Sequence, residues 1–172
     1  SAVQDPNDHL ARGEMQLAAT FAGVGFGNAG CHLPHGMSYP VAGMIRGFLP
    51  QGYPSGHAMV PHGMSVILNA PAVFRFTASA NPNRHLRAAS LMGADVSGAG
   101  PDDAGDLLAG AIIKVIRQLN IPNGLSAIGY DANDVDDLVM GTLPQHRVTK
   151  LSPRPAGEGD LRQLFQNSMT IW

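Results

Sequence analysis

Residues 25–40 read GFGNAGCHLPHGMSYP, and this stretch decides how the rest of the chain is interpreted. A second histidine–glycine pair follows in residues 60–74, which read VPHGMSVILNAPAVF. No Asp, Glu, Lys or Arg occurs between Glu14 and Arg46, so His35 lies in strongly apolar sequence. An imidazole that is buried without a partner loses its water at a cost in free energy. His35 and His62 therefore need either a metal ion or a structural hydrogen bond.

The separation of these two histidines is 27 positions, which is too long for two ligands on one helix. It suits two neighbouring helices joined by a loop, each of which presents one imidazole. Imidazole is the most common metal ligand and suits iron and zinc, but a metal site needs at least three protein ligands. No carboxylate lies in the apolar region, so His35 and His62 predict half of a metal site. The alternative is a non-catalytic helical module, used for binding or oligomerisation, in which both are structural hydrogen-bonding residues.

The remaining histidines are weaker candidates. His32 lies one helical turn before His35 and precedes the expected start of that helix. His57 lies in a loop, where it is expected to be solvated, with a place near the substrate as the alternative. Three others lie among polar or charged residues and are expected at the surface: His9, His85 and His146.

Composition limits the class of protein. A chain of 172 residues with 44% hydrophobic residues is enough for one domain, here taken as residues 1–172. Its net charge of -2 argues against nucleic-acid binding, which needs a basic face. One cysteine excludes an intrachain disulfide, and no signal peptide is visible. Glycines, prolines and histidines interrupt the uncharged run 15–45, which favours a buried helix and helix end over a membrane span.

The pattern along the chain is helical throughout, and no segment alternates as a strand does. The expected class is therefore all-α. Proline and acidic residues mark most helix starts. Helices are expected from Asp5 through Val24, from Pro34, from Pro61 with a kink at Pro71, from Asn81 to near Gly93, from Pro101 to Asn120, from Asp131 through Val139, and from Glu158 or Asp160. Residues 47–56 and the proline-bearing segment 144–155 are expected to be a loop and a linker.

These motifs resemble the C-terminal helical domain of the iron-containing (group III) alcohol dehydrogenases, which have the dehydroquinate synthase-like fold. The resemblance rests on residues 25–40 and 60–74 and extends over nearly the whole chain. Residues 124–155, GLSAIGYDANDVDDLVMGTLPQHRVTKLSPRP, are most similar to the hydroxyacid–oxoacid transhydrogenase branch.

This resemblance implies roles for four residues. His35 and His62 match the last two of three histidines that, with one aspartate, hold a divalent metal in the family. Fe2+ is the expected metal, and Zn2+ is the alternative. Phe26 matches a position near the nicotinamide of NAD(P). Tyr39 stands where many relatives have a second histidine, since the family pattern HGMxHP is HGMSYP here. Its phenol lies four positions after His35, and Tyr39 is the candidate catalytic residue.

The resemblance also implies that this chain is a fragment. The first two metal ligands and the α/β nucleotide-binding domain of the family lie upstream and have no counterpart here. Substrates would be small alcohols, hydroxy acids or oxo acids, and neither nucleic acid nor membrane is expected as a partner, although a homo-oligomer is allowed. The isolated chain is expected to be inactive and to bind metal weakly. The location would be the cytoplasm in a bacterium, or mitochondria in a eukaryote.

Overall fold

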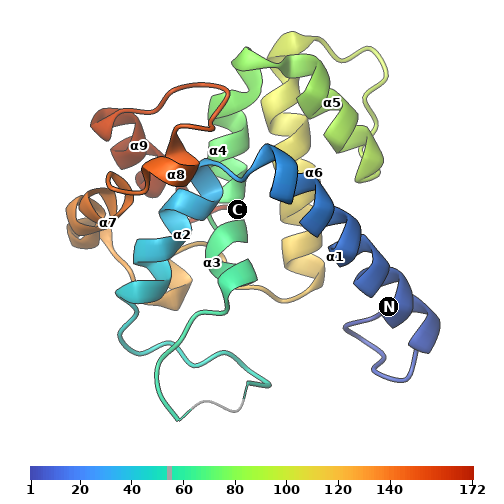
Figure 1. The fold of residues 1–172 in the computed structure, drawn as a ribbon, viewed down its shortest axis with the longest axis horizontal. Helices are drawn as coiled ribbons and strands as arrows, with labels where there is room; N and C mark the ends of the chain where they lie inside the picture. Colours follow the sequence, from blue (N-terminus) through green and yellow to red (C-terminus); the bar gives the residue numbers. More distant parts are fainter. Residues whose placement is uncertain (54–55) are drawn as a thin grey trace. The chain divides into compact units, whose positions relative to one another are not determined.

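The computed structural model describes residues 1–53 and 56–172, and all regular structure in those residues is helical. The predicted all-α class is therefore confirmed. The nine helices α1–α9 of the described residues are labelled in Figure 1, and short 3-10 turns lie between some of them: η1 (Ala78–Ala80), η2 (Pro101–Asp103), η3 (Ser126–Ile128) and η4 (Ala132–Asp134). The helices are α1 (His9–Ala29), α2 (Leu33–Gly43), α3 (His62–Ile67), α4 (Ala70–Thr77), α5 (Pro82–Leu91), α6 (Ala104–Gln118), α7 (Val135–Thr142), α8 (His146–Thr149) and α9 (Glu158–Ser168).

The chain divides into two compact units, residues 1–31 and residues 32–172. The first unit contains α1, which begins at His9 because the side chain of Asp8 accepts a hydrogen bond from the backbone N–H of Ala11 at 2.9 Å. The expected start at Asp5 was therefore too early. No residue of α1 is buried, so the expectation of a buried helix in this part of the uncharged run was wrong. Among the described residues, no helix combines the length and the apolar character that crossing a membrane requires.

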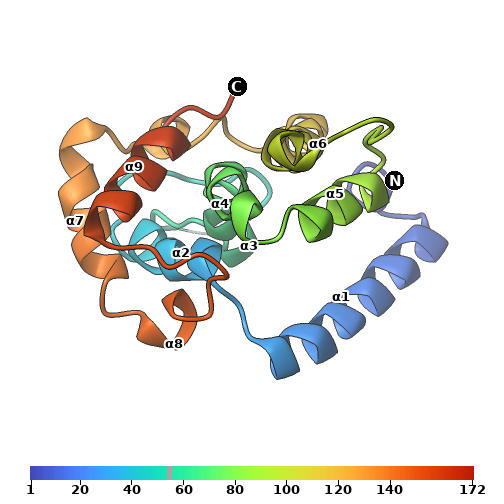
Figure 2. The ribbon, with the colours of Figure 1, turned by 90° about the horizontal axis from the view of Figure 1, so that it is seen from above.

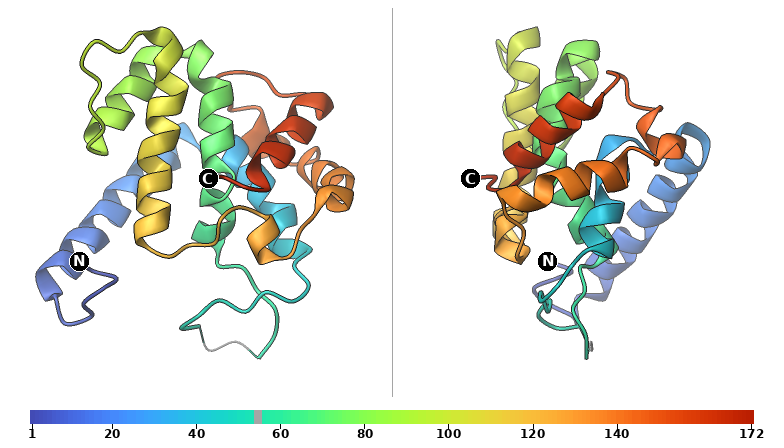
Figure 3. Two further views of the ribbon diagram at one scale, coloured as in Figure 1. Left: turned by 180° about the vertical axis from the view of Figure 1, so that it is seen from behind. Right: turned by 90° about the vertical axis from the view of Figure 1, so that its left-hand side faces the viewer.

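Within the second unit, α4 lies between two groups of helices (Figures 2 and 3). On one side, α2, α7 and α9 pack around a core that contains Leu33, Met37, Leu138 and Phe165. On the other side, α5 and α6 pack around Leu108, Ile112 and Ile116 among others. This arrangement holds α2 rigidly, because its inner face is fully buried.

Glycine allows α4 and α6 to cross closely. A Cβ atom at Gly105 would lie 3.0 Å from the Cα atom of Arg75, which is tighter than ordinary packing. Arg75 also forms an ion pair with Asp106 at 2.6 Å. The contact therefore depends on a residue without a side chain at position 105.

The predicted kink at Pro71 is instead a break between two helices. α3 ends at Ile67 and α4 begins at Ala70, which places Pro71 in the first turn of α4. A proline lacks the backbone N–H that a helix interior needs, but the first turn has no use for it. α3 is consequently a short, separate helix whose first residue is His62.

Two features differ from the expected linkers. The segment 144–155 contains a helix, α8, which packs on α2. The expected loop 47–56 carries no helix where it is described, and its residues 54–55 lie outside the described part.

The C-terminal end of α2 is held by a residue far away in the sequence, because the hydroxyl of Tyr130 donates to the carbonyl of Val41 at 2.7 Å. Burial raises the pKa of Tyr130 to about 12, so this donor keeps its proton at neutral pH.

Candidate metal centre

His35 and His62 come together in the second unit. His35 is half-buried near the start of α2, and His62 is exposed as the first residue of α3. Their ring centroids lie 5.4 Å apart with an interplanar angle of 60°. The two residues that the sequence singled out are thus neighbours in space, on two helices joined by a loop, as their spacing predicted.

The rings of His35 and His62 are free to act as ligands. Neither ring forms a hydrogen bond with any residue that the structure describes. The alternative of two structural histidines predicts rings that are capped by backbone or carboxylate groups, and these rings are not capped in residues 1–53 and 56–172. Burial, and then the proximity of His62, lower the pKa of His35. The neutral imidazole that this favours is the form that binds a metal.

His85 shows what a structural histidine looks like in this protein. Its Nδ1 lies 2.9 Å from the carbonyl oxygen of Asn81, and its Nε2 lies 3.0 Å from the hydroxyl of Thr77. Its side chain is almost wholly buried, with 7% exposed, so the expectation that it lies at the surface was wrong. The charged residues around it in the sequence point outward from α5, whereas His85 faces inward. His9, His57 and His146 are exposed, as predicted.

His32 lies just before α2, in the N-cap position, as its place in the sequence suggested. Its ring packs edge-on against Phe74, with centroids 5.9 Å apart. Its Nδ1 is buried and finds no hydrogen-bond partner in the described residues. The pKa of His32 is lowered, mainly by burial and to a smaller extent by the charges of the neighbouring His35 and His85. His32 is therefore held neutral within an aromatic cluster.

The donor set fits half of a metal site. Within residues 1–53 and 56–172, no group of three or more His, Cys, Asp or Glu side chains is placed to hold a metal ion. Two uncapped imidazoles at 5.4 Å are suitable for one metal, but a complete site needs further ligands. The sequence predicts this half-site, and the structure brings the two rings close together, while their role as metal ligands stays a prediction.

Tyr39 lies one helical turn after His35 on α2 and is half-buried. Its hydroxyl accepts a hydrogen bond from a guanidinium N–H of Arg147, at 3.0 Å. Arg147 belongs to α8, which crosses α2 at Gly36. A Cβ atom at Gly36 would lie 2.8 Å from Cγ2 of Thr149, so the glycine that follows His35 permits this approach.

Sequence reasoning missed Arg147, because 108 positions separate it from Tyr39. One signal was present in the sequence. Residues 138–157 contain three cationic side chains and no Asp or Glu, so this segment carries a net positive charge.

The predicted cofactor-contacting residue, Phe26, lies in the first unit. It belongs to α1, and 55% of its surface is exposed. A role for Phe26 beside a nicotinamide stays a prediction. Cys31, at the end of the same unit, is half-buried.

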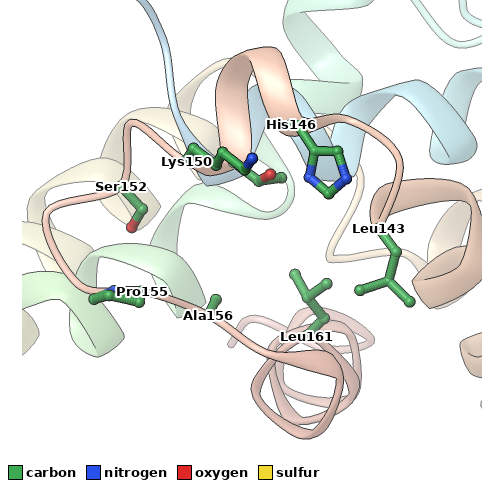
Figure 4. Close-up of a pocket in the computed structure, with 8 residues that line it drawn as sticks. Leu143, His146, Lys150, Ser152, Pro155, Ala156 and Leu161 are labelled. Carbon is green, nitrogen blue, oxygen red and sulfur yellow. The ribbon is translucent and has the colours of Figure 1, made fainter.

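The opposite side of α8 borders a separate hollow of about 360 Å³ (Figure 4). His146, at the start of α8, and Lys150, just after its end, line this hollow together with the apolar side chains of Leu143 and Leu161 (Figure 4). Arg147 does not line this hollow. The cations of α8 therefore divide between two faces, and only Arg147 reaches the neighbourhood of Tyr39.

Comparison with known proteins places this geometry in a family. Residues 1–169 match the model of the Fe-containing alcohol dehydrogenase family, C-terminal part. The chain belongs to this family. The predicted resemblance is thereby confirmed, and so is the similarity to one branch of the family. Over 171 residues, the chain is 56% identical to a probable hydroxyacid-oxoacid transhydrogenase, mitochondrial, from Dictyostelium discoideum, and 51% identical to the hydroxyacid-oxoacid transhydrogenase, mitochondrial, from Rattus norvegicus.

Solved structures share the helical fold of this chain. A 1,3-propanediol oxidoreductase is 25% identical to this chain with a TM-score of 0.81, over 94% of this chain and 39% of that protein. An alcohol dehydrogenase from Oenococcus oeni has a TM-score of 0.83 over 95% of this chain and 39% of its own. The matches to the Dictyostelium and rat relatives cover 99% of this chain but only 31% and 37% of those proteins. The chain therefore spans about a third of the length of its curated relatives.

Proposed function

We propose that this chain is the C-terminal metal-binding part of an NAD(P)-linked hydroxyacid–oxoacid transhydrogenase. The observation that supports it most is the convergence of His35 and His62, with uncapped rings 5.4 Å apart. The identity of 56% to a protein of that name favours the transhydrogenase over a simple alcohol dehydrogenase. The relatives carry the word mitochondrial in their names, so we infer a mitochondrial location if the source is a eukaryote.

In this proposal the missing half of the site comes from residues that precede this chain in its relatives. An aspartate and a histidine would complete a site for a divalent metal, Fe2+ or Zn2+, and an α/β domain would bind NAD(P). The metal would supply a Lewis acid, and the nicotinamide would accept and return a hydride. We expect the isolated chain to be inactive, because it has only two of the four ligands.

The residues of this chain have three tasks in the reaction. The imidazoles of His35 and His62 act as ligands and fix one wall of the site. The Oη atom of Tyr39 accepts a hydrogen bond from Arg147, which leaves its own proton available to donate to a substrate oxygen. Phe26 shapes the wall against the nicotinamide. In the complete exchange, a hydroxy acid loses a hydride and a proton, and an oxo acid gains both.

A chimera tests this proposal. This chain replaces the matching 171 residues of the Dictyostelium relative, and the oxidation of 4-hydroxybutyrate is coupled to the reduction of an oxo acid without added NAD(P). We expect turnover by the chimera and a loss of at least about 100-fold in H35A and in H62A, in the range seen when a catalytic group is removed. H57A is the matched control, because His57 is an exposed loop histidine.

Two results would contradict the proposal. A folded chimera that turns over alcohols but exchanges no hydride between acids would refute the transhydrogenase assignment. Full activity in H35A or H62A would refute the ligand assignment, whatever the substrate.

A further inference from the structure

The guanidinium of Arg147, on α8, contacts a residue of α2, the helix that carries His35. It touches α2 one turn beyond His35, where one of its N–H groups donates to the hydroxyl of Tyr39 at 3.0 Å. A guanidinium has five N–H donors in a fixed plane, so most of its donors are left for another partner. These remaining donors therefore lie next to Tyr39, one helical turn after His35 on α2.

Arg147 forms no ion pair with an acidic side chain in the described residues, a feature that it shares with Arg12, Arg84, Arg87, Arg117 and Arg154. Arg46, Arg75 and Arg162 each form an ion pair with an Asp or Glu. Within residues 1–53 and 56–172, no carboxylate lies within 4.0 Å of Arg147. The sequence supplies none nearby, because residues 138–157 contain no Asp or Glu. The segment thus presents a positive charge beside the candidate metal centre without neutralising it.

The contact between α8 and α2 holds this cation in position. Val148 is buried, and it lies with Thr149 against Gly36, the glycine next to His35. The backbone of α8 is therefore anchored at the turn from which Arg147 projects. A charge held in a fixed place loses less freedom when a ligand binds than a mobile one does.

We propose that Arg147 binds the carboxylate of the hydroxy-acid and oxo-acid substrates. This assignment rests on the proposed function and deepens it, because it names the group that distinguishes acids from neutral alcohols. A guanidinium matches a carboxylate with two parallel hydrogen bonds, and such charge-assisted bonds are stronger than neutral ones. With the carboxylate on Arg147, the distant hydroxyl or carbonyl end of the substrate extends toward His35 and His62. Tyr39 holds the guanidinium through its hydroxyl and lies between the two ends.

The experiment uses the chimera and compares two inhibitors of the same shape. Butyrate carries the carboxylate, and butyramide is its neutral counterpart. In the unmodified chimera we expect butyrate to inhibit oxidation of the hydroxy acid more strongly than butyramide does. In R147Q we expect the inhibition constant of butyrate and the KM for the hydroxy acid to rise by about 10- to 100-fold, as for the loss of a hydrogen bond between charged groups. The inhibition constant of butyramide should change by less than about threefold, within ordinary surface-mutation effects.

Two further variants separate this role from a structural one. R147K keeps the charge but loses the paired geometry, so its KM for the hydroxy acid should fall between those of the parent and R147Q. K150Q removes a cation from the other face of α8 and should leave both inhibition constants unchanged, because Lys150 lines the separate hollow.

Two results would overturn the assignment of Arg147. In an active chimera, equal weakening of butyrate and butyramide in R147Q would mean that Arg147 only supports the fold. An R147Q variant with the parent's KM and inhibition constants would exclude any contact with the substrate. An unmodified chimera that is folded but exchanges no hydride is a different result, because it refutes the proposed function itself and the substrate role of Arg147 with it.

Discussion

At the scale of single residues, the chain uses histidine in two different ways. His85 is buried with both ring nitrogens next to hydrogen-bonding groups, whereas His35 and His62 face each other without such groups. His35 is half-buried and His62 is exposed, so their ring nitrogens are open to a further partner, whereas both nitrogens of His85 are already occupied within the fold. The contrast within one chain is the physical reason for treating His35 and His62 as candidate ligands.

His32 gives a prediction at this scale. Its Nδ1 is buried without a partner in the described residues, and its ring packs against Phe74. Phenylalanine fills a similar volume without the unsatisfied nitrogen, so H32F should leave the free energy of unfolding unchanged or raise it by about 1 kcal/mol. H85F is the control and should lower it by about 1 to 3 kcal/mol, because Thr77 and Asn81 lose their partner.

Denaturant unfolding of the isolated chain measures both variants. The interpretation of His32 as an unpartnered core residue fails if H32F destabilises the chain as much as H85F does.

At the scale of elements, the two histidine–glycine pairs have different structural reasons. Gly36 is buried where α8 crosses α2, and a Cβ atom there would lie 2.8 Å from Cγ2 of Thr149. Gly63 is exposed on α3, and a Cβ atom there would meet nothing within 4 Å. In the His35–Gly36 pair the glycine therefore permits close helix packing, whereas in the His62–Gly63 pair it lies on an open surface.

This difference predicts opposite effects of one substitution. G36A should lower the free energy of unfolding by about 1 to 3 kcal/mol, because it overpacks the α2–α8 contact. G63A should be neutral or raise it by up to about 1 kcal/mol, because alanine favours a helix more than glycine does. T149S removes the opposing methyl group, so the double variant G36A/T149S should recover part of the loss. If G36A and G63A have equal effects in denaturant unfolding, the close α2–α8 contact is not what requires glycine.

The elements also show how far sequence could lead. Caps and prolines located most helices, because they act within a few residues of themselves. Pro71 marks a helix boundary rather than the predicted kink, and at this boundary the side chain of Asn69 donates to the carbonyl of Ser65 in the buried core. α8 escaped prediction because four residues carry no periodicity, and its contact with α2 at Gly36 is made only in the folded chain.

At the scale of the whole molecule, the sequence identified both histidines of the candidate site but not its surroundings. His35 and His62 stand out locally, because each precedes glycine in apolar sequence. Arg147 does not, since its neighbour Tyr39 lies 108 positions away and only the fold brings them together. The inward position of His85 was likewise hidden, because the charged residues beside it in the sequence occupy the other faces of α5.

The chain also spans only about a third of its curated relatives, so its half-site is best tested within a full-length protein. Two histidines alone are a weak site, and four ligands are a strong one. Metal retention should therefore depend on both this chain and the residues that precede it in its relatives.

The most direct test is the metal content of the purified chimera after dialysis against a chelator, measured by elemental analysis. We predict about one divalent metal ion per chain in the chimera, as expected for a site with four protein ligands. The double variant H35A/H62A should retain almost none, and H57A/H146A should match the unmodified chimera. A folded H35A/H62A chimera that keeps its metal would contradict the claim that these two histidines are ligands.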